Sequence, residues 1–230
     1  MPDSRITRLE PFGPRGLNVR VHLDEGDPIE VMLEAIERSR LGVGDELTAA
    51  ARSRLLDADA DIRVREAALE LLSYRARTRQ ELKRKLRGKR FDPERIDTCL
   101  AQLEEKGLLS DAAVAASFVR DRLRLRPRGR TRLASELRAK GVDADVAQET
   151  IALVFEDEEV SDVDLARGAA EAWLARQPAA VSSALASRSH TPESGKAKRR
   201  LHGYLTRRGF RGDALHAAMA HAEACVASRS

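Results

Sequence analysis

The 230-residue sequence predicts a mostly α-helical protein, in which tandem three-helix repeats form an elongated curved array after a small β-rich N-terminal segment. Aromatic residues make up only 3% of the chain, whereas a large β-sheet core depends on aromatic and β-branched side chains. In addition, one spacing of apolar residues occurs three times along the chain. Such internal recurrence is typical of helical repeat proteins.

The first 44 residues have strand character. Apolar and polar residues alternate in Ser4–Glu10 and in Asn18–Asp24, and Pro28–Leu33 is a third β-prone run. We therefore expect a small meander of three strands, which needs a neighbouring element to pack against. A connecting helix over residues 45–58 is expected to link this segment, 1–44, to the first repeat.

Each of the three repeats carries an apolar spacing of four and then five residues within its middle helix and the turn that follows. The positions are Leu82, Leu86 and Phe91, then Leu133, Leu137 and Val142, then Leu201, Leu205 and Phe210. We expect these side chains to be buried while Arg and Lys on the same helices are exposed. Each middle helix is expected to end at a glycine: Gly88, Gly141 and Gly209.

After each turn an acid is expected to cap the next helix, because a carboxylate oxygen accepts the free N–H groups of a first turn. The expected caps are Asp92, Asp143 and Asp213, and the first helices of the second and third repeats are expected to start at Ser110 and Ser161, 51 residues apart. These signals predict repeats over 59–108, 109–160 and 161–230. The third repeat is longer, and its segment near 177–197, rich in Ser, Ala, Arg and Pro, is expected to be an inserted loop.

Charge is segregated along the chain, although the net charge is only +4. Tyr74–Arg90 holds nine Lys or Arg against one Glu, and Arg120–Lys140 holds nine against two acids. Lys196–Arg211 holds seven and no acid, whereas Asp143–Asp164 holds nine acids and no base. Blocks of one sign create a local field that a mixed surface does not.

The three basic windows occupy the same phase of the three repeats, so we expect stacking to align them into one binding stripe. Arginine grips phosphate or carboxylate through two N–H groups, which suits nucleic-acid backbone or an acidic protein surface. The alternative is that these are ordinary solvated helix faces. The predicted stripe consists of Arg75, Arg77, Arg79, Lys83, Arg84, Arg87, Arg124, Arg126, Arg128, Arg130, Arg132, Lys196, Lys198, Arg199, Arg200, Arg207 and Arg208.

Stacking on bases is not predicted, because Phe91, Phe118, Trp173 and Phe210 lie at apolar positions of the repeats and are expected in the core. Contact with nucleic acid would then be to the backbone. The acidic run Glu156–Glu159 has two interpretations, a solvated junction that balances basic neighbours or a contact for a basic partner.

No catalytic constellation or phosphate-binding loop is present in the sequence, so we predict a protein that is not an enzyme and needs no cofactor. His221 and Cys225, four apart on one helix, could offer two metal ligands, but without a second such pair no metal site is predicted. No apolar run is long enough to span a membrane, no signal peptide is evident, and two cysteines are too few for a disulfide framework. A cytoplasmic monomer is expected.

Several motifs resemble the RecX family over about Asp59 to Ala222. They are YRARTRQEL from Tyr74, GLLSD from Gly107, ELRAKGV from Glu136 with Gly129 before it, and LHGYLTRRGF from Leu201. The resemblance implies a regulatory protein that binds the filament of the RecA recombinase on single-stranded DNA, in its helical groove. It also implies inhibition of the ATPase and strand-exchange activities, with roles in homologous recombination, DNA repair and the SOS response.

An architectural DNA-binding protein is the alternative function. Tandem three-helix units also resemble helix-turn-helix modules, which hold duplex backbone without a recombinase. Stable binding to bare duplex DNA would favour this second interpretation.

Overall fold

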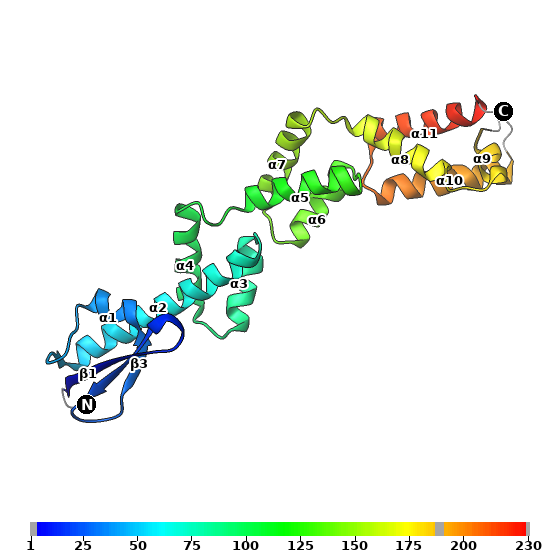
Figure 1. Ribbon diagram of the computed structural model, residues 1–230. Helices are drawn as coiled ribbons and strands as arrows, with labels where there is room; N and C mark the ends of the chain where they lie inside the picture. Colours follow the sequence, from blue (N-terminus) through cyan, green and yellow to red (C-terminus); the bar gives the residue numbers. More distant parts are fainter. Residues whose placement is uncertain (1–3, 187–190, 229–230) are drawn as a thin grey trace. The chain divides into compact units, whose positions relative to one another are not determined.

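The computed structural model describes residues 4–186 and 191–228 and divides the chain into two compact units. The first unit consists of Met1–Arg77 and Glu81–Leu109, and the second of Thr78–Gln80 and Ser110–Ser230. The predicted mostly α-helical class is confirmed, with a small N-terminal sheet before the helices (Figure 1). The elongated curved array and the boundaries of the second and third repeats stay predictions.

The first unit begins with an antiparallel sheet in the order β3-β2-β1-β4. The three predicted strands are confirmed, and a fourth short strand and a helix were not predicted. The elements are β1 (Ser4–Phe12), the 3₁₀ turn η1 (Pro14–Gly16), β2 (Asn18–Leu23), β3 (Ile29–Met32), α1 (Leu33–Ser39) and β4 (Glu46–Leu47). Val19, Val21 and Val31 point into a core that Leu55 and Ile62 of the next helix complete.

That next helix, α2 (Ala49–Tyr74), corrects the predicted division between a connecting helix at 45–58 and a repeat that begins at Asp59. It runs unbroken through this point because no Gly or Pro interrupts it. Asp59 lies within the helix, where its carboxylate accepts the Met32 N–H at 2.6 Å and the Arg63 Nε–H at 2.7 Å. The same helix therefore covers the sheet with its first half and begins the first repeat with its second.

Two further helices, α3 (Arg79–Gly88) and α4 (Pro93–Glu105), complete the first repeat. The second repeat consists of α5 (Asp111–Leu125), α6 (Arg130–Ala139) and α7 (Ala144–Asp157). The third consists of α8 (Asp162–Leu174), α9 (Ala179–Ala186), α10 (Pro192–Arg207) and α11 (Gly212–Ala227). The predicted apolar positions are buried, apart from the half-buried Phe91: Leu82, Leu86, Leu133, Leu137, Val142, Leu201, Leu205 and Phe210.

Two of the three predicted caps are confirmed, because Asp92 and Asp143 each accept a first-turn N–H. The predicted helix starts at Ser110 and Ser161 are confirmed too, and both side chains cap their helices. The prediction for Asp213 is wrong. Arg211 occupies the cap position of α11, and Asp213 lies in the first turn. There its negative charge interacts favourably with the positive end of the helix dipole, but the carboxylate accepts no capping hydrogen bond.

The glycine at the end of the middle helix is confirmed in two repeats only. Gly141 and Gly209 have φ of +84° and +89°, in the left-handed region that glycine adopts without a steric penalty. In the first repeat Gly88 is still helical, and Arg90 takes the left-handed position with φ of 66°. Arg90 directly precedes Phe91, as Gly141 precedes Val142. The left-handed residue of each repeat is therefore the one before the apolar residue, whether or not it is a glycine.

The segment predicted as a loop near 177–197 is largely helical. It contains α9 and the first turn of α10, which Thr191 caps, and residues 187–190 lie outside the described residues. Alanine has the strongest intrinsic preference for helix, and α9 is Ala-rich. Its Leu185 is fully buried in the core of the third repeat, so packing supports the helix as well.

The second and third repeats join within the second unit through a close backbone contact. The Gly129 N–H donates to Arg208 O at 2.9 Å, and an Arg208 guanidinium N–H donates to Pro127 O at 3.1 Å. A related contact involves Thr78, whose hydroxyl donates to Lys140 O at 2.7 Å. In both cases the residue before a middle helix bonds to the carbonyl that ends another middle helix.

Glycine is required at this contact, and we expect Gly129→Ala to destabilise the second unit by about 1–3 kcal/mol, the range for overpacking. A Cβ at Gly129 would lie 2.5 Å from Gly209 O, and backbone on both sides limits relaxation. Denaturant unfolding of the variant measures the loss. Gly168→Ala is the control: nothing lies within 4 Å of its Cβ, so this helical site should gain about 0.5–1 kcal/mol. Equal effects at the two sites would contradict the proposed close contact.

Candidate polyanion-binding surface

Six of the seventeen Lys and Arg residues of the predicted binding stripe form ion pairs with carboxylates of this chain. Arg130 Nε lies 3.2 Å from Asp162 Oδ2, and its guanidinium also stacks over the Phe155 ring at 4.1 Å. Side chains with an internal ion pair stabilise the fold and are less available to a binding partner. The six are Arg75, Lys83, Arg128, Arg130, Arg132 and Lys198.

Three others are held at the backbone. Arg77 donates from Nε to Leu71 O at 3.0 Å, and Arg208 donates to Pro127 O while lying over the Tyr204 ring. Arg79 is half-buried, and its backbone N–H donates to Asp111 Oδ1 at 2.7 Å. The guanidinium groups of Arg77 and Arg208 therefore have a structural role within the chain, whereas the Arg79 contact is made by its main chain.

The remaining eight predicted residues are available to a partner. Nearly all their side chains are exposed, and none has an ion-pair partner in the described part of the chain. They are Arg84, Arg87, Arg124, Arg126, Lys196, Arg199, Arg200 and Arg207. An exposed arginine with no internal carboxylate keeps all of its N–H donors for a phosphate or an external carboxylate.

Several cations gather in a cleft of about 520 Å³ where α6 meets α10 and the turn before α11. We call it the joint cleft. Four arginines and three hydroxyl side chains line it, and no acid does among the described lining residues. It is lined by Arg128, Thr131, Arg132, Ser135, Thr206, Arg207, Gly209 and Arg211.

Glu136 organises the arginines at one side of the joint cleft. Its carboxylate accepts from Arg122 Nε at 2.9 Å and from Arg132 Nε at 2.8 Å, and Arg128 Nε lies 3.9 Å away. Burial alone would raise the pKa of Glu136, but the hydrogen bonds from Arg122 and Arg132 outweigh burial and lower it. One carboxylate against three guanidinium groups leaves a local excess of positive charge.

Two donors near the joint cleft lack acceptors within the described residues. Thr206 Oγ1 and Arg128 Nε are both shielded from solvent and have no hydrogen-bond partner. A buried donor without an acceptor is costly. Because both atoms are shielded from solvent, the case for an anion rests on the four arginines and three hydroxyl side chains that line the cleft.

A second basic cleft, of about 560 Å³, lies between α8 and the segment that joins α5 to α6. Arg126, Arg128, Arg176 and Arg208 line it, with Tyr204 and the acid Asp164. Because Arg128 lines both clefts, cations from the second and third repeats form one connected group. The two clefts do not include the first basic window, Tyr74–Arg90, which belongs mostly to the first unit. A single stripe through all three repeats therefore stays a prediction.

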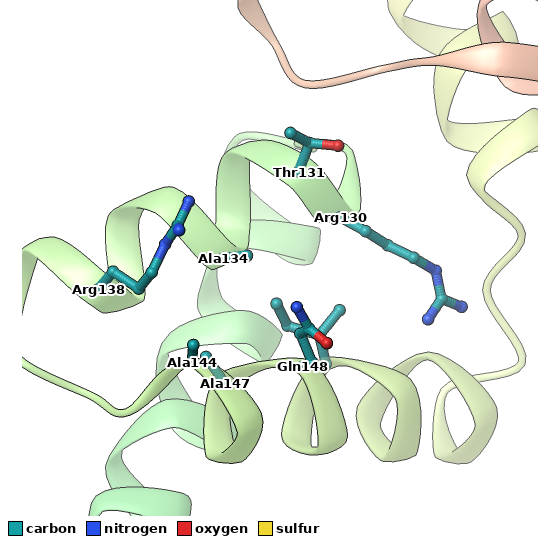
Figure 2. Close-up of a pocket in the computed structure, with 8 residues that line it drawn as sticks. Arg130, Thr131, Ala134, Arg138, Ala144, Ala147 and Gln148 are labelled. Carbon is teal, nitrogen blue, oxygen red and sulfur yellow. The ribbon is translucent and has the colours of Figure 1, made fainter.

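Figure 2 shows a third cleft, of about 430 Å³, between α6 and α7. Arg130 and Arg138 project from α6, and Gln148 from α7, over a floor of alanines. Arg130 is engaged with Asp162, whereas Arg138 is exposed. Arg138 and Arg211 were both omitted from the predicted stripe, although the basic windows Arg120–Lys140 and Lys196–Arg211 already contained them.

The aromatic side chains offer little surface for stacking on bases. Trp173 and Phe210 are buried, and Phe118 is half-buried with Arg122 and Lys140 over its ring. Tyr74 is 76% exposed and belongs to the first unit, whereas the joint cleft belongs to the second. The expected core position of the aromatics therefore holds, apart from the partial exposure of Phe91 and Phe118.

The acidic run ends α7 and has a basic neighbour. Arg120 pairs with Asp157 at 3.0 Å and with Glu158 at 3.0 Å. Carboxylates at a helix C-terminus face the negative end of its dipole, and Arg120 offsets that repulsion. This geometry favours the interpretation as a solvated junction.

Two of the three-helix units match family models of known proteins. Residues 65–103 match the model of the first three-helix domain of RecX, and residues 110–151 that of its second three-helix domain. The regulatory protein RecX of Amycolatopsis mediterranei is 37% identical over 148 residues, which cover 64% of this chain and 76% of that protein. That of Halorhodospira halophila is 37% identical over 160 residues, which cover 70% and 88%.

Solved structures agree on the fold. A crystal structure of a regulatory protein RecX covers 94% of this chain and 98% of its own, with a TM-score of 0.72 and 22% identity. RecX from Lactobacillus salivarius covers 73% of this chain and 99% of its own, with a TM-score of 0.58 and 23% identity. Among the helices that the structure describes, none has both the length and the apolar character to cross a membrane.

Proposed function

The chain belongs to the RecX family, and on this premise we propose that it regulates a RecA-type recombinase by binding the filament which that recombinase forms on single-stranded DNA. Bound in the helical groove of the filament, it lowers ATP hydrolysis and strand exchange. The recombinase as partner comes from the family. The joint cleft supports the mode of binding.

The single observation that carries this proposal is the convergence of Arg128, Arg132, Arg207 and Arg211 on one cleft. Ordinary solvated faces intersperse both signs, whereas no acid lines this cleft among the described residues. Arg128 and Arg132 share the single carboxylate of Glu136, and Arg207 and Arg211 have no carboxylate partner among the described residues. This excess of guanidinium groups suits closely spaced anions, either successive phosphates or carboxylates of a protein groove. Contacts to backbone are favoured over contacts to bases, since the exposed surface offers few aromatics.

The remaining parts of the proposal follow from this role. The chain acts by occupying a surface and catalyses no reaction of its own. We propose that it works as a monomer, in the cytoplasm where the recombinase and its DNA are found. A regulatory protein of this kind needs no cofactor for binding.

A direct test is the steady-state ATPase rate of a RecA-type recombinase on single-stranded DNA, with this chain added below the molar amount of recombinase. We expect the rate to fall, because one molecule in the filament groove affects several recombinase subunits. Binding to the filament is measured in parallel by fluorescence anisotropy of labelled DNA. An unchanged rate together with no binding to the filament would overturn the proposal.

The same experiment separates the architectural alternative. Labelled duplex DNA without recombinase is titrated with the chain at the same salt concentration. Binding to duplex that matches or exceeds binding to the filament would favour an architectural DNA-binding protein. We expect the filament to bind more tightly, because a groove that offers protein and DNA adds contacts that a bare backbone lacks.

A further inference from the structure

Three side chains with metal-ligand atoms converge at the packed pair α8 and α11, away from the basic clefts. They are Glu171 on α8 and His221 and Cys225 on α11, and their ligand atoms all lie within 4.8 Å of one another. His221 Nε2 lies 2.6 Å from Glu171 Oε1 and 3.4 Å from Cys225 Sγ. The imidazole nitrogen therefore stands between the carboxylate and the thiol.

The fold brings the three together in two steps. His221 and Cys225 are four residues apart, so they share one face of α11. Helices α8 and α11 lie side by side in Figure 1, and fully buried alanines such as Ala170 and Ala222 let them approach closely. Glu171 follows Ala170 directly, and its carboxylate consequently reaches the His221 ring across the seam.

One spacing between ligand atoms already matches a tetrahedral zinc site, and the other two need side-chain movement. The Glu171 oxygen and Cys225 Sγ lie within 4.8 Å, against about 3.6 Å when both bind one zinc ion. Zn–S of about 2.3 Å and Zn–N of about 2.05 Å place sulfur and nitrogen about 3.6 Å apart at tetrahedral angles. The Sγ to Nε2 distance of 3.4 Å already matches this value closely. The oxygen to nitrogen distance of 2.6 Å needs to open by roughly 0.7 Å, which a side chain as exposed as Glu171 permits.

We propose that Glu171, His221 and Cys225 form a binding site for a zinc-like divalent cation that links α8 to α11. A thiolate and an imidazole select borderline-soft metals and disfavour Mg²⁺ and Ca²⁺, which prefer oxygen ligands. Three protein ligands leave a fourth tetrahedral position for water or for a group from another molecule. The half-exposed His221 and exposed Glu171 give an ion a route from solvent.

The proposal is independent of the function proposed above, because it concerns the third repeat alone and needs no recombinase for its test. The untagged chain is titrated with Co²⁺ under reducing conditions. We expect a thiolate-to-cobalt charge-transfer band that saturates at one equivalent, together with visible bands of tetrahedral intensity. Zn²⁺ should abolish both by displacing cobalt.

Matched variants assign the ligands. Cys225→Ser and His221→Ala should abolish the charge-transfer band or remove its tetrahedral character, whereas Cys99→Ala and His216→Ala should leave it intact. Cys99 is buried in the first unit and His216 is exposed on the same helix α11, so each is a control of the same residue type. Circular dichroism checks that every variant keeps its helix content.

Glu171→Gln should weaken Zn²⁺ binding by at least about tenfold in competition with a chromophoric chelator, since even a supporting residue of a metal site contributes 10–100-fold. A folded chain with no charge-transfer band at excess Co²⁺ would overturn the proposal. So would a band that survives in Cys225→Ser. Either result would leave the three side chains as a hydrogen-bonded cluster only.

Discussion

Replacing Leu86, Leu137 or Leu205 with alanine is expected to lower the free energy of unfolding by about 2–5 kcal/mol in each case. All three side chains are fully buried at the same position of the middle helix in three repeats. Truncation removes apolar contacts and leaves a cavity that close-packed neighbours fill only in part. Denaturant unfolding followed by circular dichroism measures the loss.

The matched control is Leu153→Ala, because Leu153 is 54% exposed on α7 and has little buried area to lose. Its effect should stay within about 0.5 kcal/mol. Leu86 lies in the first unit and the other two in the second, so the Leu86 variant should lower the unfolding midpoint of the first unit and the other variants that of the second. Losses below half a kilocalorie at all three buried sites would contradict the assigned core.

The recurrence of this leucine explains why the fold could be predicted from the sequence. A spacing of four residues places Leu82 and Leu86 on one face of a helix, and the same face recurs at Leu133 and Leu137. The apolar spacing and the capping residues depend only on a single helix and its ends, so they can be identified in the sequence without knowledge of the tertiary structure. The cap at Asp92 and the helix start at Ser110 could be predicted for the same reason.

The features that could not be predicted depend on contacts distant in the sequence. The continuity of α2 could not be predicted because it depends on packing against the sheet, where the Asp59 carboxylate accepts a hydrogen bond from the Met32 N–H of β3. The helix α9 depends on the burial of Leu185 against the third-repeat core. Neither partner can be identified from spacing along the chain.

The candidate site was predicted at the level of charge but not of individual side chains. The basic windows were evident, yet which arginines are engaged depends on acids elsewhere, such as Asp162, which holds Arg130. Arg130 also stacks over Phe155, so its removal would disturb packing as well as charge. Residues without internal partners are therefore the informative ones to change.

Arg207→Ala combined with Arg211→Ala is expected to weaken binding to the recombinase filament on single-stranded DNA while folding stays intact. Both side chains are exposed and line the joint cleft. If both contact phosphates, the slope of log affinity against log salt concentration should decrease by about 1.4, at roughly 0.7 per phosphate on single strands. Anisotropy titrations at several salt concentrations measure both the affinity and the slope.

The control removes the same charge from a different part of the chain. Arg5 and Arg54 are exposed in the first unit, and Arg5→Ala with Arg54→Ala should change neither the affinity nor the slope appreciably. If the joint cleft instead contacts carboxylates of the recombinase, affinity falls in the cleft variant but the slope need not follow the phosphate count, because no condensed counterions are released from DNA. Normal filament binding and ATPase inhibition by a folded cleft variant would mean that these arginines are an ordinary solvated face.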